Sequence, residues 1–78
     1  LSRKEVNFMH GIKINKIQAY RKALNQKQHD MAKMLGISVV MYSKKERKET
    51  PFTDIEKVKL LNYFKQYFSN ETIDSLFF

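Results

Sequence analysis

The chain has no cysteine and no tryptophan, and its 78 residues include only two glycines and one proline. Without cysteine it has no disulfide and no thiolate metal site, so a reducing compartment suits it without being required. Two glycines are too few for a glycine-rich phosphate loop. No apolar run approaches the roughly 18 residues of a transmembrane helix, and no signal peptide is recognisable. We therefore expect a cytoplasmic protein that does not enter a membrane.

Residues that could carry chemistry are few and scattered. His10 and His29 are 19 residues apart and have no carboxylate at ligand spacing, which argues against a metal site. Ser38 and Asp30 suit helix starts better than they suit a catalytic triad with His29. The sequence therefore predicts no catalytic residue, no metal and no cofactor, and it predicts that the protein is not an enzyme.

Charge is unevenly distributed along the chain. The formal net charge is +7, from 15 Lys and Arg against 8 Asp and Glu. Residues 1–50 carry twelve basic and four acidic residues, a net +8, whereas residues 51–78 carry three and four, a net −1. A basic half favours a polyanionic partner, with nucleic acid first and an anionic membrane second. On charge alone, a simply solvated lysine-rich face is an equally good interpretation.

The stretch 28–46 contains two predicted helices with a tight turn between them. Apolar residues at helical spacing predict the first helix, which begins near residue 27 or 28 and ends at Leu35. Gly36 follows, where the chain needs a positive φ to reverse, and Ser38 is placed to cap the second helix, 39–47. Such a pair is a helix-turn-helix candidate. An earlier helix, from about Ile14 to before Asn25, should cover it.

A fourth helix is predicted from a capping box formed by Thr53 and Glu56, and it continues to about Phe68. Its apolar residues form two stripes, of which one can face the core and the other needs a partner. The first stripe contains Ile55, Val58 and Leu61, and the second contains Leu60, Phe64 and Tyr67.

A last short helix, 71–78, can be capped by Ser69 or Asn70. Its apolar end should dock on the second stripe of the fourth helix, at or beside a dimer interface, because exposed rings are costly in water. The expected dimer or partner surface therefore contains Leu60, Phe64, Tyr67, Phe77 and Phe78.

Three features of the chain together match a known pattern: the series Gln28, Ala32, Gly36, Ile37, Ser38; the later Ser43-x-x-Glu46; and the tail TIDSLFF. In these features the chain resembles the phage Cro/repressor-type, or XRE-like, helix-turn-helix family over roughly residues 13–78. The resemblance implies an all-α, lambda-repressor-like fold, a compact bundle of about five helices, preceded by an N-terminal arm of uncertain structure over residues 1–12. This chain departs from the family pattern at Lys27, where Ser or Thr usually caps the helix, and at Arg47-Lys48, where Asn-Gly is frequent.

The resemblance also implies roles for particular residues. An arginine seven residues before the glutamine pairs, in that family, with the glutamate that closes the recognition helix, which here implies a structural ion pair between Arg21 and Glu46. The recognition helix would enter the DNA major groove, and the phosphate contacts would come from Lys27, Gln28, Lys45, Arg47 and Lys48. The residues at the base edges would be Val39, Val40, Ser43 and Lys44, and Ser38 would also belong to the DNA-binding surface. In an arbitrary helix, by contrast, the two valines would more often be core and Lys44 would be solvated.

We expect a homodimeric, sequence-specific transcriptional regulator that binds a palindromic operator in double-stranded DNA, as a repressor, a Cro-like protein or a restriction-modification controller. The alternative is an antitoxin or interaction module that binds a protein partner through its C-terminal aromatic surface. A basic membrane-surface protein is a weaker interpretation, because the apolar faces are committed to helix packing.

Overall fold

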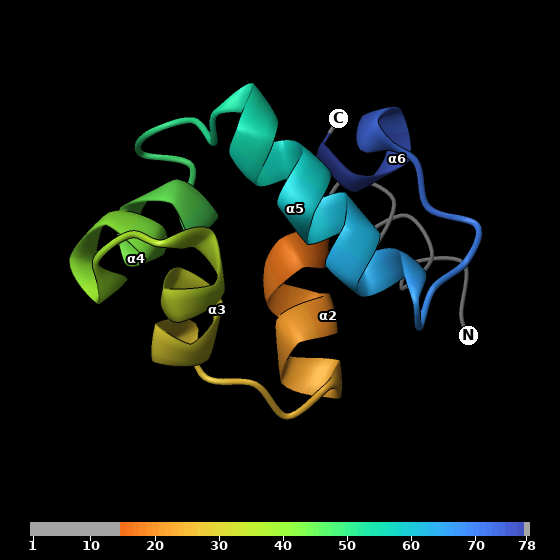
Figure 1. Cartoon of the computed structure of the whole chain (residues 1–78), viewed down its shortest axis with the longest axis horizontal. Helices are drawn as coiled ribbons and strands as arrows, with labels where there is room; N and C mark the ends of the chain where they lie inside the picture. The colour runs from red at the N-terminus through yellow and green to blue at the C-terminus, as the bar shows by residue number, and fades with distance from the viewer. Residues whose placement is uncertain (1–14, 78) are drawn as a thin grey trace, which may run out of the picture.

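The computed structural model describes residues 15–77, and this part of the chain is all-helical (Figure 1). The helices are α2 (Lys16–Ala23), α3 (Gln28–Leu35), α4 (Val39–Glu46), α5 (Asp54–Lys65) and α6 (Ile73–Phe77). The predicted all-α class and small helical bundle are therefore confirmed. The predicted N-terminal arm, Ile14 at the start of the first helix and Phe78 all lie outside the described residues.

Short polar side chains set the starts of the helices. Asn15 Oδ1 accepts a hydrogen bond from the Gln18 amide, and Ser38 Oγ accepts one from the Met41 amide. The predicted capping box is present, because Thr53 Oγ1 accepts from the Glu56 amide and the Glu56 carboxylate accepts from the Thr53 amide. Each bond satisfies an amide that has no partner within its own helix.

Three helices end in the same way, with one residue in the left-handed conformation. Asn25, Gly36 and Lys48 have φ values of 58°, 73° and 66°. In each case the next amide donates to a carbonyl five residues earlier, as in the bond from Ile37 to Ala32 and the bond from Glu49 to Lys44. This is the Schellman arrangement. It turns the chain sharply between α2 and α3, between α3 and α4, and after α4.

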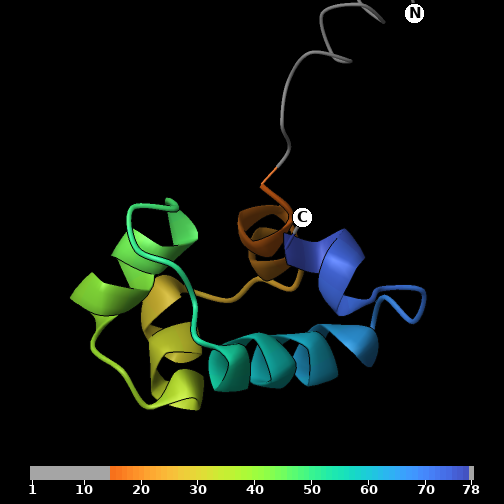
Figure 2. The same ribbon diagram turned by 90° about the horizontal axis from the view of Figure 1, so that it is seen from above.

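A single core joins the helices. Its largest fully buried side chains are Tyr42, Phe64, Met31 and Leu60, which come from α3, α4 and α5. Figure 2 shows α5 running along one side of the molecule, with α3 and α4 near one of its ends and α6 near the other. Because α5 contributes Leu60 and Phe64 to the core, it connects the α3–α4 pair to α2 and α6.

Two predicted boundaries are wrong. The fourth helix ends at Lys65 rather than near Phe68, and the last helix begins at Ile73 rather than residue 71. The cap of the last helix is Thr72, whose Oγ1 accepts from the Ser75 amide, and not Ser69 or Asn70. The segment between α5 and α6 packs against α2 instead of continuing either helix. Within it, the ring of Phe68 stacks on Tyr20 with centroids 3.9 Å apart.

The predicted partner surface is also wrong in its central residues. Leu60 and Phe64 are completely buried in the core, so they offer nothing to a partner. Phe77 is half-buried and packs edge-on against Phe52, whereas Tyr67 is 56% exposed. On the other stripe, Ile55 and Val58 are exposed, whereas Leu61 is half-buried against the core.

Within the described range, no helix is long and apolar enough to cross a bilayer.

Candidate nucleic-acid interface

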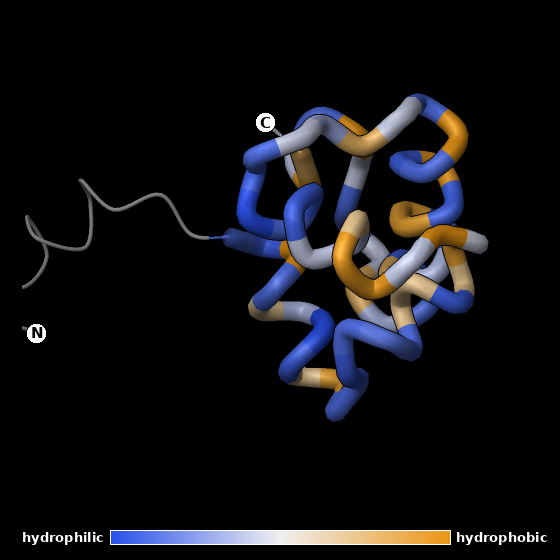
Figure 3. The backbone as a smooth tube through the Cα atoms, turned by 90° about the vertical axis from the view of Figure 1, so that its left-hand side faces the viewer, coloured by the Kyte–Doolittle hydropathy of each residue, from blue (hydrophilic) through white to orange (hydrophobic). Residues whose placement is uncertain are grey.

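Helix α4 lies at one end of the molecule and presents a long side to solvent (Figure 1). Val39 is 44% exposed and Val40 is 62% exposed, and Met41 and Lys44 are exposed beside them. Figure 3 views the molecule from this end, and it shows apolar stretches of the backbone standing among hydrophilic ones. We call Val39, Val40, Ser43 and Lys44 the α4 edge. Ser43 is half-buried in it.

The opposite side of α4 is buried. Tyr42, Lys45 and Glu46 are at most 7% exposed, and their spacing of three and four residues places them on one face of the helix. Helix α4 therefore has a buried inner face, which polar contacts hold in place, and an exposed outer edge. The predicted role of Lys45 as a phosphate contact is wrong, because its ammonium is buried 2.5 Å from the Glu56 carboxylate.

The carboxylate of Glu46 is the centre of the inner face. Arg21 donates to it from two nitrogens, with Nε 2.8 Å from Oε2 and Nη2 3.0 Å from Oε1. The hydroxyl of Tyr42 donates to Oε2 at 2.6 Å, and the amide of Gln28 donates to Oε1 at 3.2 Å. The expected ion pair between Arg21 and Glu46 is thus present. It connects α2, α3 and α4 through one buried acceptor.

These contacts shift the ionisation of the groups involved. Burial raises the pKa of Glu46, but hydrogen bonds from Arg21, Tyr42 and Gln28 lower it more, so the pKa lies below its ordinary value. Burial also raises the pKa of Tyr42, with a further rise from its bond to Glu46. Tyr42 therefore stays a neutral donor and Glu46 stays an anion near neutral pH, which is the combination that this network needs.

A second ion pair fixes the end of α4 against the start of α5. Burial alone would raise the pKa of Glu56, but the bonds from Lys45 and from the Thr53 amide outweigh burial and leave the pKa lowered. Since Glu56 also completes the capping box, one carboxylate both begins α5 and anchors α4. The direction of the α4 edge is therefore set by two separate buried charges.

Among the predicted phosphate contacts, the structure leaves three cations exposed. Lys27 precedes α3, and Arg47 and Lys48 follow α4. Arg47 donates to the Glu49 carboxylate and to Ser43 Oγ. An exposed pair of this kind contributes little to stability.

Gln28 and Ser38, which the sequence predicts as DNA contacts, both make hydrogen bonds within the protein. The half-buried side chain of Gln28 is directed to Glu46, and the Ser38 hydroxyl is used in the cap of α4. Ser38 directly precedes α4, whereas Gln28 is the first residue of α3. The spacing of residues in the sequence did not predict that Gln28 would contact Glu46. Both residues nevertheless belong to the pattern in which the chain resembles XRE-like proteins.

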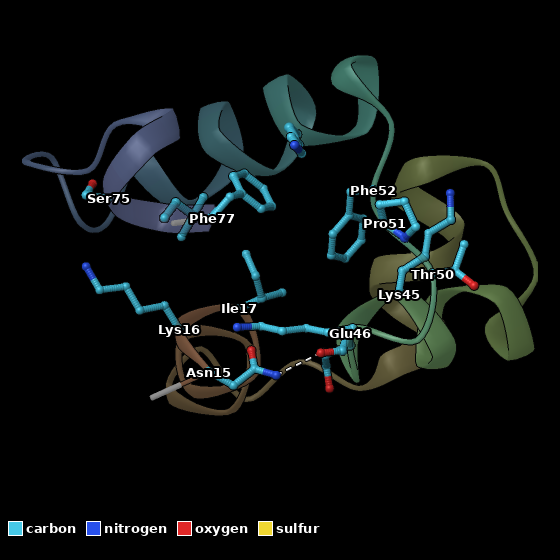
Figure 4. A pocket seen from close by; sticks show the side chains of 13 residues that line it. Asn15, Lys16, Ile17, Lys45, Glu46, Thr50, Pro51, Phe52, Ser75 and Phe77 are labelled. Carbon is cyan, nitrogen blue, oxygen red and sulfur yellow. Dashed lines mark hydrogen bonds between the residues drawn. The ribbon is translucent and has the colours of Figure 1, made fainter. Parts of the chain in front are cut away.

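A cavity of about 680 Å³ lies behind α4, between the start of α2, the 48–52 loop and α6 (Figure 4). Its apolar lining includes Ile17, Phe52 and Phe77, and Asn15 also lines it. The Asn15 side-chain amide donates to the backbone oxygen of Glu46 at 2.8 Å, which ties the last turn of α4 to the start of α2. The cavity is therefore on the inner side of α4, away from the exposed edge.

Among residues 15–77, no group of three or more His, Asp or Glu side chains is arranged to hold a metal ion. No family model matches the chain, and no curated protein or solved structure matches it significantly. The resemblance to XRE-like proteins therefore stays a prediction from the sequence.

Proposed function

We propose that the protein is a sequence-specific DNA-binding transcriptional regulator in which α3, the 36–38 turn and α4 act as a helix-turn-helix. The observation that carries this proposal is the exposed α4 edge. An α-helix fits the major groove of B-DNA, and residues near its N-terminus reach the base edges. Val39 and Val40 are at that end of α4 and point outward, although exposed valines are unfavourable in water.

The chemistry of the α4 edge suits base recognition. The methyl groups of Val39 and Val40 can pack on the 5-methyl group of thymine, and Lys44 can donate to guanine O6 and N7. Lys44 lies four residues after Val40, so the two side chains share one face of the helix. The exposed cations Lys27 and Lys48 are at the two ends of the α3–α4 unit, where phosphate contacts would fix its position on the duplex.

The rigidity of α4 supports the same function. Discrimination between bases requires a reading helix whose position is fixed before binding, because ordering it on the DNA would lower affinity. The buried contacts of Glu46 and Lys45 hold α4 against three other helices.

The experiment is a selection of duplexes from a random pool by the full chain, followed by sequencing of the bound fraction. We expect enrichment of a palindromic consensus, with half-sites about one helical turn apart, because two copies would place their α4 helices in successive major grooves. A bound fraction with the same sequence composition as the starting pool would contradict specific recognition. A single half-site without symmetry would keep recognition but contradict the dimer.

A further inference from the structure

The cavity behind α4 has the size and the lining of a site for a small organic molecule. Its volume of about 680 Å³ lies within the range of roughly 300–1,000 Å³ that is usual for such sites. Figure 4 shows Ile17, Phe52 and Phe77 pointing toward one space from α2, the 48–52 loop and α6. The rings of Phe52 and Phe77 meet edge-on with centroids 5.8 Å apart. Three separate segments thus form one apolar wall, which can cover the apolar part of a ligand.

The charges at the cavity are mainly positive. Among the described residues, its lining contains one acid, Glu46, and four lysines, which are Lys16, Lys45, Lys48 and Lys57. The acid is already paired with Arg21. Two acids outside the lining, Glu56 and Glu71, pair with Lys45 and Lys16. Even when all of these partners are counted, basic groups outnumber acidic ones, so the cavity favours an anionic group.

Lys48 and Lys57 bring positive charge to the cavity from two different segments. Lys48 is exposed and follows α4, whereas Lys57 is half-buried on α5. The Nζ atom of Lys57 is 5.7 Å from the centroid of the Phe77 ring. An ammonium group therefore lies directly beside the apolar wall. A ligand that fits both features carries an anionic group at the end of an apolar body.

We propose that this cavity binds a small organic carboxylate, with its apolar body among Ile17, Phe52 and Phe77 and its carboxylate toward Lys48 and Lys57. An inorganic anion or a nucleic-acid phosphate would use the lysines but would leave the apolar wall in contact with water. A neutral apolar molecule would gain nothing from the lysines. The site is distinct from the α4 edge. Lys48 is also a predicted phosphate contact, but the test contains no DNA, so the two proposals can fail separately.

The first experiment compares three probes by the backbone amide chemical shifts of the isotopically labelled full chain. Octanoate has both proposed features, acetate has the carboxylate without the body, and octylammonium has the body with the opposite charge. We expect octanoate to cause saturable changes at Ile17, Phe52 and Phe77, with a dissociation constant at least tenfold lower than that of either other probe. If octanoate causes no saturable change at these residues, or if acetate or octylammonium binds as tightly, the proposal is wrong.

The second experiment tests the lysines. The double variant Lys48→Gln with Lys57→Gln should raise the dissociation constant of octanoate at least tenfold. The matched control is Lys33→Gln with Lys65→Gln, which removes the same charge from exposed positions outside the lining and should leave the constant nearly unchanged. Circular dichroism checks that both variants are folded. Equal weakening in the two variants would mean that octanoate responds only to the net charge of the protein, which would contradict a built site.

The alternative occupant is the chain itself, since residues 1–14 directly precede Asn15 in the lining. Nuclear Overhauser measurements on the full chain decide between the two. We expect contacts from the methylene protons of octanoate to the rings of Phe52 and Phe77. Contacts from residues 1–14 to the same rings, with or without octanoate, would assign the cavity to that segment and exclude a small carboxylate as its ligand.

Discussion

At the scale of single residues, the buried carboxylate of Glu46 joins α2, α3 and α4. A buried carboxylate is tolerated only where donors replace its lost water, and here two nitrogens of Arg21, one hydroxyl and one amide do so. Removal of one donor leaves the charge partly unpaired in the interior.

Arg21→Met should therefore lower the free energy of unfolding by about 3–5 kcal/mol, the usual cost of leaving one partner of a buried pair alone. Urea denaturation followed by circular dichroism measures this change. The double variant Arg21→Met with Glu46→Leu removes both charges and should recover much of the loss. A wild-type midpoint in Arg21→Met alone would mean that the pair contributes nothing to stability.

The same buried acids predict how stability depends on pH. Glu46 and Glu56 both have a pKa below the ordinary value of 4.5 in the folded protein. Their stabilising contribution is complete above the pKa of the unfolded chain, and it is lost as the pH falls through the lower folded pKa. The free energy of unfolding should thus decrease steadily below about pH 5.

Two variants test the source of this decrease. Glu46→Gln should make the pH dependence shallower, because one of the titrating groups is gone. Glu49→Gln should leave it nearly unchanged, since the pair of Glu49 with Arg47 is exposed and contributes little. Equal slopes for Glu46→Gln and wild type would contradict the assignment of the acid response to Glu46.

Backbone conformation gives a third prediction at this scale. A Cβ at Gly36 would meet no atom within 4 Å, so Gly36→Ala creates no clash and tests the left-handed φ of 73° alone. The expected loss is about 1–2 kcal/mol. Lys48 has a φ of 66° at the equivalent place after α4, so Lys48→Gly should instead raise stability, by about 1 kcal/mol or less once the greater freedom of unfolded glycine is subtracted. The midpoint temperature of thermal unfolding should fall for Gly36→Ala and rise for Lys48→Gly. Shifts of the same sign would show that φ does not determine the change in stability at one of the two positions.

At the scale of helices, α4 combines a fixed inner face with the exposed edge, and its two lysines at positions 44 and 45 show the difference. Lys44 is exposed, whereas Lys45 is in the buried pair with Glu56. Adjacent residues of the same type therefore have opposite expected functions, and only the exposed one can touch DNA without unfolding the helix.

Lys44→Ala should weaken binding to the selected duplex by about 1–3 kcal/mol and relax the preference at one base pair. Lys48→Ala should weaken binding to every duplex and lower the salt slope by about one, because it removes a phosphate contact. Alanine is a suitable replacement at Lys48, since it keeps a Cβ at the strained φ and changes only the charge. Fluorescence anisotropy with matched and scrambled duplexes separates the two effects, and an unchanged base preference in Lys44→Ala would exclude Lys44 as a base-reading residue.

Local sequence signals predicted the five helices found in residues 15–77, the end of α3 at Leu35 and the capping box of α5, because these depend on local chemistry. They could not choose between the two stripes of α5, since both repeat at helical spacing and only packing against the other helices, such as the contact of Tyr20 with Phe64, buries the second stripe. Lys45 was misjudged for a related reason: a lysine is usually solvated, and its partner Glu56 is eleven residues away in another helix. The left-handed Lys48 gives no local signal, whereas Gly36 does.

At the scale of the whole molecule, polar contacts to buried acids hold both ends of the bundle. At one end they orient α4, and at the other Glu71 accepts from Lys16, Tyr20 and Ser75, which fixes α6 against α2. Between these ends lies the apolar core with α5 across it (Figure 2).

The two halves of the chain also differ in charge. The strongly basic half of the sequence contains α2, α3 and α4, whereas the half that contains α5 and α6 is close to neutral. A strongly basic half attracts polyanions in general, and it would attract a duplex if the proposed function holds.

The most direct test of DNA recognition by the α4 edge is the change in backbone amide chemical shifts when the selected duplex is added to isotopically labelled protein. We expect the largest changes at Lys27 and Gln28 and over residues 38–44, with smaller changes in α6. Changes concentrated in α6 and absent from residues 38–44 would contradict it.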